Sequence, residues 1–284
     1  VTSAVTHLVG GFDSEWGGFG AAPKFPSTMN IDLLLRSNAT HPNAAALHVS
    51  TTSLDAMASG GIYDHLGGGF ARYSVDREWL VPHFEKMLYD QALLVRVYLH
   101  AYQVTQYPRY KQVVEETINY VLRDLTHQDG GFFSAEDADS ADESGHHHEG
   151  WFYTWTPHEV RELFDAELSA EIFEWYGMTD AGNFEGRNIL TRHFERGSLL
   201  RNERIEAARQ VMFTKRLERE RPLLDDKVLT EWNGYMLSSL AEAAAAFNNQ
   251  SWLDAAIANA EFLIRELRSE DDTWKRSWHE TGAP

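Results

Sequence analysis

His83 and Glu85 stand two residues apart after a proline and carry side chains suited to proton transfer. An imidazole and a carboxyl group at the mouth of a helix can act as a general acid and base pair. Apolar residues at three- and four-residue spacing predict a long helix over residues 83–106. In that helix Lys86 and Asp90 would share a face with His83. The structural alternative is that Glu85 complements the helix dipole while His83 satisfies a loop carbonyl.

Further polar and aromatic side chains surround this pair in the sequence, which favours a binding role for the whole region. The substrate-binding candidates here are Asp64, His65, Arg72, Tyr73, Trp79, Lys86 and Asp90. Aromatic faces beside acidic groups suit carbohydrates, because the C–H faces of a sugar are apolar while its hydroxyl edges need hydrogen bonds.

A second acidic segment follows a glycine turn and contains Glu136, Asp137 and Asp139. Two carboxyl groups on opposite walls of a sugar pocket can protonate a leaving oxygen and activate a water molecule. We take Asp137 as the catalytic candidate, and Asp139 and Glu136 as substrate-binding candidates. The alternative is a solvated acidic loop.

Three adjacent histidines, residues 146–148, precede Glu149 and raise the question of a metal site. Neighbouring residues of a loop cannot readily direct all their side chains at one ion, and a metal site needs further groups that orient its ligands. We therefore predict a solvent-exposed loop, with no metal ion and no cofactor. Glu149 is assigned to the pocket rim as a substrate-binding residue, because it leads into the aromatic segment 151–155.

Three residues around the start of a later helix complete the candidates for substrate binding. Asp226 precedes this helix, and Asn233 within it could bond a ligand hydroxyl. Trp232 could stack on a sugar face, although it also fits the apolar stripe of the helix and could pack in the core. The motifs of serine hydrolases with a nucleophile elbow, P-loop proteins, zinc metalloproteases and EF-hand proteins do not occur in the sequence.

Gly-Gly-Phe turns follow helical segments at 17–19, 68–70 and 130–132, with a related turn at 60–62. In a chain of helical hairpins, such turns would all lie at one rim of the helical array, and their polar residues would line that rim. The predicted fold is therefore all-α, an incomplete α/α toroid in one domain over residues 1–284, with short β-hairpin pieces in the rim loops. Other predicted helices cover segment 1–9, as the tail of a helix, and segments 108–125, 203–219, 229–247 and 251–268. A further helix is predicted to start in segment 156–159, where Thr156 and Glu159 form a capping box. Short extended pieces are predicted at 151–155 and 274–279.

The composition excludes several classes of protein. The formal net charge of −18 disfavours nucleic acids and anionic membranes as partners. The chain has no cysteine, so disulfides and thiol nucleophiles are excluded within it. No apolar stretch is long enough to span a membrane and no signal peptide opens the chain, so we expect a cytoplasmic protein. The first residues are typical of the tail of a helix, so we expect a fragment of a longer chain.

Five segments resemble one known family. They are GGFGAAPKFP, GGGFARYSVDREWLVPHFEKMLYDQA, GGFFSAEDADS, EGWFYTW and DDKVLTEWNG, in this order between Gly17 and Gly234. They are similar to the thioredoxin-domain-containing proteins, which include the spermatogenesis-associated thioredoxin-like proteins of animals and their bacterial homologues. The resemblance implies an N-terminal thioredoxin-like domain followed by a toroid similar to six-hairpin glycosidases and sugar 2-epimerases. This chain lacks that domain and its cysteines, and stops before the final hairpins.

Two functional hypotheses follow. The first is a carbohydrate-active enzyme. In a glycoside hydrolase, Asp137 and Glu85 would be the acid and the base. In a sugar epimerase or isomerase, His83 would remove a proton beside a carbonyl, and Lys86 or Arg72 would stabilise the enolate, although the paired histidines of known epimerases have no obvious match here. The second hypothesis is a non-catalytic binding or scaffold module that serves a thioredoxin-like domain of the same protein.

Overall fold

The computed structural model describes residues 1–281, in which helices dominate. The helices are α1 (Thr2–Gly10), α2 (Thr28–Thr40), α3 (Ala44–Ser59), α4 (Leu88–Thr105), α5 (Pro108–Asp124), α6 (Pro157–Leu163), α7 (Ala166–Tyr176), α8 (Glu203–Arg216), α9 (Thr230–Phe247) and α10 (Gln250–Phe262), with a 3-10 turn at His193–Glu195 and a π-helical end at Leu263–Leu267. The short strands are β1 (Tyr73–Ser74), β2 (Pro82–His83), β3 (Lys86–Met87), β4 (Ala135–Glu136), β5 (Asp139–Ala141), β6 (His147–Glu149), β7 (Leu224–Asp225), β8 (Val228–Leu229) and β9 (Ser277–Trp278).

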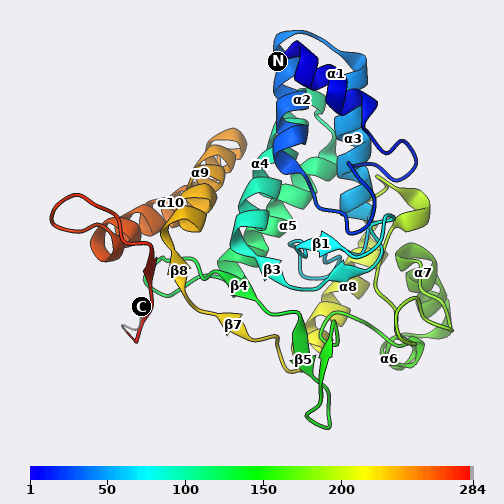
Figure 1. Cartoon of the computed structure of the whole chain (residues 1–284). Coiled ribbons are helices and arrows are strands. Elements are labelled where there is room, and N and C mark those ends of the chain that lie inside the picture. The colour runs from blue at the N-terminus through cyan, green and yellow to red at the C-terminus, as the bar shows by residue number, and fades with distance from the viewer. Residues whose placement is uncertain (282–284) are drawn as a thin grey trace.

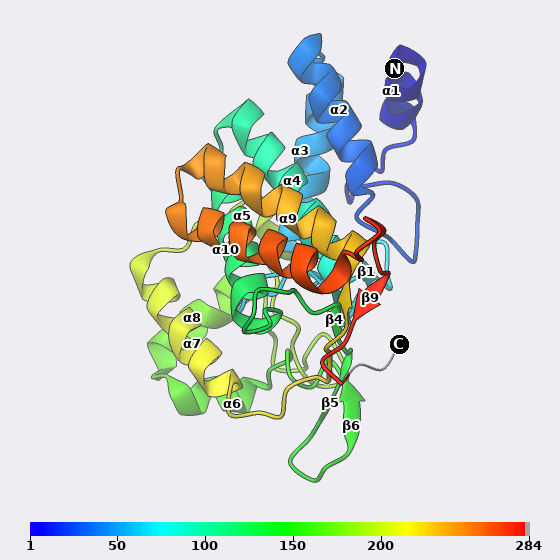
Figure 2. The ribbon, with the colours of Figure 1, turned by 90° about the vertical axis from the view of Figure 1, so that its left-hand side faces the viewer.

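Three helical hairpins, α2–α3, α4–α5 and α9–α10, form the body of the described chain (Figure 1). Helices α2, α4 and α9 pack side by side in one row, and each also packs against the second helix of its own hairpin. Figure 2 shows α9 and α10 running alongside each other in front of α4 and α5. The predicted all-α class with short strand pieces is confirmed, and the hairpins are arranged as in part of an α/α toroid.

Local sequence signals account for where several helices begin. Pro108 opens α5 at a position where its missing N–H is no loss. The predicted capping box at the start of α6 is confirmed, because Thr156 and Glu159 each bond the backbone of the other. Helix α10 begins one residue before the predicted start, because Asn249 is its side-chain cap.

The Gly-Gly-Phe turns share one backbone pattern. In the first, Asp13 N–H donates to Gly18 and Gly17 N–H donates to Asp13; in the second, Asp64 makes the equivalent bonds with Gly69 and Gly68. Gly68 and Gly69 have φ of 78° and 81°, a left-handed conformation that glycine adopts without strain. These bonds close each turn on itself.

Side-chain amides fasten two of these turns to helices. Gln91 in α4 accepts from Phe70 N–H at 2.7 Å and donates to Phe70 O at 2.7 Å. Asn233 in α9 does the same to Phe132, at 2.8 and 2.9 Å. Buried main-chain N–H and C=O groups need hydrogen-bond partners. These two side-chain amides provide the partners that a neighbouring strand would provide in a regular sheet. Asn233, predicted to bond a ligand, is fully buried and occupied with this structural role.

Three of the five segments that resemble the family meet in one small sheet, β3–β4–β7. In it Lys86 pairs with Glu136, and Ala135 pairs with Asp225. Between β4 and β7 the chain makes the β5–β6 hairpin and helices α6 to α8, which lie below the hairpin body in Figure 1. The predicted strand at 151–155 is wrong, since this segment is a turn that follows β6.

Helix α10 buries Trp252, Ala256 and Phe262, with Phe262 fully buried. Leu253 and Ile257, which are also apolar, are 39% and 49% exposed. The first part of the helix therefore carries apolar residues on its outer face as well. No helix of residues 1–281 has the length and the apolar character that a membrane span requires.

His100 ties the three helices of the row together. Its Nδ1 lies 2.5 Å from Asp32 of α2 and its Nε2 lies 2.7 Å from Glu242 of α9. Arg36 pairs with Asp32, and Arg96 pairs with Glu242. The hydrogen bond to Asp32, followed by the one to Glu242, raises the pKa of His100 against its burial.

This network predicts a pH-dependent stability. A histidine with a raised folded pKa stabilises the fold fully below its ordinary value of 6.5, and this contribution is lost as the pH rises through the folded pKa. We expect His100→Gln to remove about 1 kcal/mol or more at pH 6 and less at pH 9. Urea unfolding at both pH values measures this, with His7→Gln on the exposed face of α1 as the control. An equal loss at both pH values would show that the charge on His100 does not matter.

Candidate functional site

The segment from Pro82 to Met87 is extended, and its burial alternates along the chain. Phe84 and Lys86 point inward and are buried, whereas His83 and Glu85 remain partly exposed. Side chains two apart on an extended chain share a face. The predicted helix over 83–106 is therefore wrong at its start, because α4 begins at Leu88. His83 and Glu85 form the exposed pair, and Lys86 belongs to the opposite face.

His83 lies between two carboxylates. Its Nδ1 is 2.8 Å from Oε1 of Glu149 in β6, and its Nε2 is 3.6 Å from Oε2 of Glu85. Its ring stacks on Tyr73 at 5.0 Å between centroids. When Nδ1–H donates to Glu149, Nε2 carries the lone pair of a base. The side chains of His83 and Glu149 are 30% and 42% exposed, so a ligand can reach them.

Arg72 extends the cluster towards the first turn of α4. Its Nη1 donates to Glu85 at 3.2 Å. A hydrogen bond that Arg72 donates to the Tyr89 oxygen is the main cause that raises the pKa of Arg72. Tyr89 in turn meets Trp232 of α9 edge to face at 4.9 Å. The side chain of Asp90 lies in the same turn of α4, where burial raises its pKa to about 8.

The two acidic residues predicted after the third Gly-Gly-Phe turn have different surroundings. Asp139 is exposed and is the cross-strand partner of Glu149 in the β5–β6 hairpin, so both side chains lie on one face of it. Asp137 is also exposed, and its Oδ1 accepts from the N–H of Ala138 at 2.7 Å. The structure thus brings Asp139 to the Glu149–His83 pair. Within the described chain it shows no bond from Asp137 to that pair.

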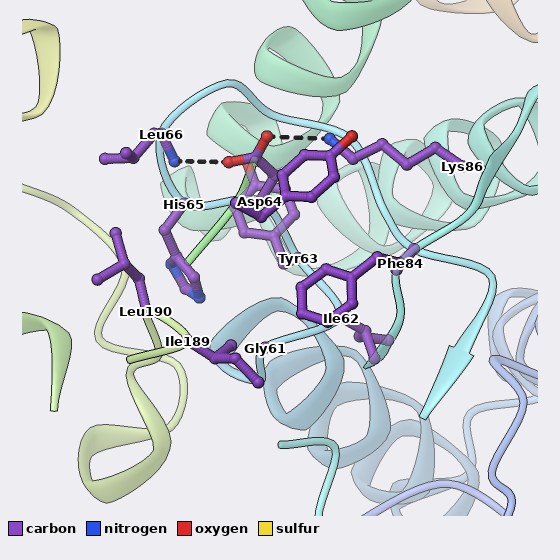
Figure 3. A pocket seen from close by; sticks show the side chains of 12 residues that line it. Gly61, Ile62, Tyr63, Asp64, His65, Leu66, Phe84, Lys86, Ile189 and Leu190 are labelled. Atoms are coloured by element: carbon purple, nitrogen blue, oxygen red, sulfur yellow. Dashed lines mark hydrogen bonds and ion pairs between the residues drawn. The ribbon is translucent and has the colours of Figure 1, made fainter. Parts of the chain in front are cut away.

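Lys86, on the opposite face of segment 82–87 from His83 and Glu85, belongs to a buried ion triad with Asp64 and Arg216. Figure 3 shows its contact with Asp64. Lys86 Nζ is 2.9 Å from Asp64, and Arg216 from α8 binds both oxygens of Asp64 at 2.8 Å. The ammonium group also faces the rings of Tyr120 and Tyr153 at 4.3 and 4.7 Å. Burial opposes ionisation, but Arg216 and Lys86 hold the pKa of Asp64 well below its usual range.

The cavity beside this triad is too small for a sugar. It encloses about 30 Å³ between Asp64, Lys86, Phe84 and Ile189, which is room for one or two water molecules. His65 also lines it, bonds the carbonyl of Gly60 at 3.0 Å, and has its pKa lowered to about 4 by burial. Asp64, His65 and Lys86, all predicted to bind substrate, thus line this small cavity.

Three other predicted residues lie apart from the cluster or are engaged elsewhere. Glu136 is buried and accepts from the Tyr120 hydroxyl at 2.7 Å and from Arg221 at 2.5 Å. Trp79 is fully buried and its indole donates to the carbonyl of Trp16 at 2.9 Å. Asp226 pairs with His279 at 2.8 Å. Sequence reasoning missed Arg216 and Tyr89; Tyr89 stands in the long family-like segment, whereas nothing near Arg216 marks it.

The histidine run occupies the tip and second strand of the β5–β6 hairpin. His146 bonds the Ser144 hydroxyl at 2.7 Å, and His148 pairs with Asp142 at 3.1 Å. In residues 1–281 no group of three or more histidine and carboxylate side chains is placed to hold a metal ion. Two larger hollows, of about 580 and 670 Å³, are lined by none of the predicted site residues.

The sequence is similar to longer proteins. It is 38% identical to human spermatogenesis-associated protein 20, in an alignment that covers 90% of this chain and 37% of that protein. The chain therefore spans little more than a third of the length of the curated relatives it matches. No protein-family model matches the chain.

Solved structures with similar helical folds have low sequence identity. A family 76 glycoside hydrolase (mannosidase) from Bacteroides thetaiotaomicron is 12% identical with a TM-score of 0.47, covering 87% of this chain and 47% of that one. Cellobiose 2-epimerase from Spirochaeta thermophila is 14% identical with a TM-score of 0.44, covering 99% and 86%. These likenesses concern the fold alone. Over the aligned region, the chain is a homologue of spermatogenesis-associated protein 20.

Proposed function

We propose that the chain carries an acid–base site for a reducing sugar, and that it moves a proton at the carbon beside the sugar carbonyl, as an epimerase or isomerase does. The observation that supports this most is the imidazole of His83, with Nδ1 held by Glu149 at 2.8 Å. A carboxylate that accepts from one ring nitrogen fixes the tautomer and makes the other nitrogen the base.

The groups around this base suit the same chemistry. Removing a proton beside a carbonyl places negative charge on the carbonyl oxygen, and a neighbouring cation stabilises that charge. Arg72 is the cation of the exposed cluster, 3.2 Å from Glu85. Lys86, the other predicted candidate for this role, is only 3% exposed and is paired with Asp64. Tyr73 and Trp232 are half-buried aromatic side chains at the cluster, and aromatic side chains of this kind contact the apolar side of a sugar ring.

Proton exchange in heavy water tests the proposal directly. The protein is incubated with pooled aldoses and ketoses in D₂O, and proton NMR follows the loss of the C2 or C1 hydrogen. We expect His83→Asn to lower the exchange rate about 100-fold to 10,000-fold, because the base is gone while the binding surface remains. His146→Asn, at the exposed hairpin tip, is the control.

Two results would contradict the proposal. Exchange that persists in His83→Asn would remove His83 as the base. If saturation-transfer NMR detects no sugar bound to the wild-type chain, the site is not a sugar site, and the non-catalytic role beside a thioredoxin-like domain becomes the better explanation.

Glycoside hydrolysis is a second candidate, because two carboxylates, Glu85 and Glu149, flank the same imidazole. A carboxyl pair across a cleft is the arrangement that glycosidases use. The same samples, supplied with disaccharides, distinguish the two reactions by release of monosaccharide without exchange of carbon-bound hydrogen.

A further inference from the structure

Asp90 is a carboxyl group in unusual surroundings. It stands in the first turn of α4, where the helix dipole favours a negative charge. Yet its Oδ2 is buried and has no hydrogen-bond partner among the described residues. An ionised oxygen enclosed without a partner is strongly disfavoured, whereas a protonated carboxyl group tolerates that place. The residue as a whole is half-buried.

The neighbouring charged groups have opposite effects on the pKa of Asp90, and burial has the largest effect. Arg72, just before β1, favours the ionised form, and Glu85 of the extended segment 82–87 favours the neutral form. Tyr89 on α4 itself favours the ionised form through a hydrogen bond. From α9, the side chain that meets this turn is Trp232, which does not titrate. Burial is the largest effect and keeps the proton on the group.

A second atom of the cluster also lacks a partner. The Nε of Arg72 is buried and makes no hydrogen bond within residues 1–281. Native proteins leave few buried polar atoms unpaired. The Arg72 N–H and the Asp90 carboxyl oxygen thus both lack a hydrogen-bond partner, and both side chains lie beside Glu85 and Tyr89. A ligand oxygen bound there would pair with both groups after small movements of the side chains.

We propose that Asp90 is the proton donor of this site and delivers its carboxyl proton to the carbonyl oxygen of an open-chain sugar. This inference rests on the proposed function. His83 Nε2 takes the proton from the neighbouring carbon, and the C–H electron pair forms a carbon–carbon double bond. The carbonyl π electrons pass to oxygen, which takes the proton from Asp90. The imidazolium then delivers its proton to the former carbonyl carbon, and the Asp90 carboxylate takes the proton of the other enediol hydroxyl. This gives the isomeric sugar and restores both groups, so no oxidant or reductant is needed.

Carboxyl titration by carbon NMR tests the donor without any sugar. In protein labelled at the aspartate carboxyl carbon, the resonance that Asp90→Asn removes is followed between pH 3 and pH 10. We expect its midpoint at about 8. A midpoint in the ordinary carboxyl range would overturn the proposal, whatever the sugar experiments show.

The exchange assay then separates donation from binding. We expect Asp90→Asn to lose exchange about 100-fold or more, because an amide can hydrogen-bond an oxygen but has no acidic proton to give. Sugar binding by saturation transfer should stay within a few-fold of wild type. The matched control is Asp254→Asn, an exposed acid near the start of α10.

The outcomes are distinguishable. A midpoint at about 8 together with full exchange in Asp90→Asn would show a buried acid that donates nothing to substrate, and would overturn this inference alone. Absence of sugar binding in the wild type would overturn the proposed function and the donor role with it.

Discussion

Asp64→Ala is expected to lower the free energy of unfolding by about 3–5 kcal/mol. The carboxylate is shared by Lys86 and Arg216, both nearly fully buried. Its removal leaves two cations inside the protein without a counter-charge, and their desolvation is no longer offset. The substitution also removes the oxygen that accepts from the N–H groups of Leu66 and Gly67 in the turn.

Urea unfolding of Asp64→Ala and of Asp271→Ala separates the two contributions. Asp271 accepts from the N–H of Thr273 in an exposed turn and has no buried cation beside it. We expect its loss to amount to about 1 kcal/mol or less. Equal effects of the two substitutions would mean that the ion triad adds nothing beyond a turn hydrogen bond.

Gly61→Ala is expected to lower the free energy of unfolding by about 3 kcal/mol or more. A Cβ atom at this position would overlap the carbonyl oxygen of Leu80 and would lie 2.5 Å from Cγ2 of Ile189. The obstacle is main chain, which cannot rotate away as a side chain can. The displaced segment around Leu80 leads directly to β2 and His83, so the substitution should also impair the candidate site.

Gly234→Ala is the matched control for this prediction. Gly234 lies inside α9, and a Cβ there has no atom within 4 Å. Alanine in an open helical position should raise stability by about 0.5–1 kcal/mol, because glycine loses more chain entropy on folding. The midpoint temperature of thermal unfolding should therefore fall for Gly61→Ala and rise for Gly234→Ala. A small effect at Gly61 would show that the segment around Leu80 can move aside at little cost.

The sequence predicts the hairpin body well and the start of α4 poorly, for a physical reason. Helical spacing is strong wherever one face of a helix is buried, as in α5 and α9. In the segment 82–87 the alternation that the structure shows requires Lys86 to point inward. Polarity alone would not place a lysine inside. Its burial depends on Asp64 and on Arg216, which lies 152 residues from Asp64 in sequence.

The candidate site is predictable in part. His83, Glu85 and Glu149 could be selected as chemically suited residues, and the structure brings them together through the β5–β6 hairpin and the extended segment. The role of Asn233 could not be derived in this way. Its partner is the main chain of Phe132, so no side-chain pattern signals the contact. One similarity between two segments hints at this role. In both, a lysine and a leucine two residues later precede a side-chain amide, which is Gln91 in α4 and Asn233 in α9.

The contact between Phe132 and Asn233 has a consequence for how this molecule can vary. The two residues are 101 positions apart, so the bond joins the two ends of the long segment 132–233, which contains α6, α7 and α8. Closing a loop becomes only slightly harder as the loop lengthens, by about 0.6 kcal/mol for each doubling. Insertions in the exposed tip of the β5–β6 hairpin, residues 143–146, should therefore cost little stability, whereas α8 is held in place by the contact of Arg216 with Asp64.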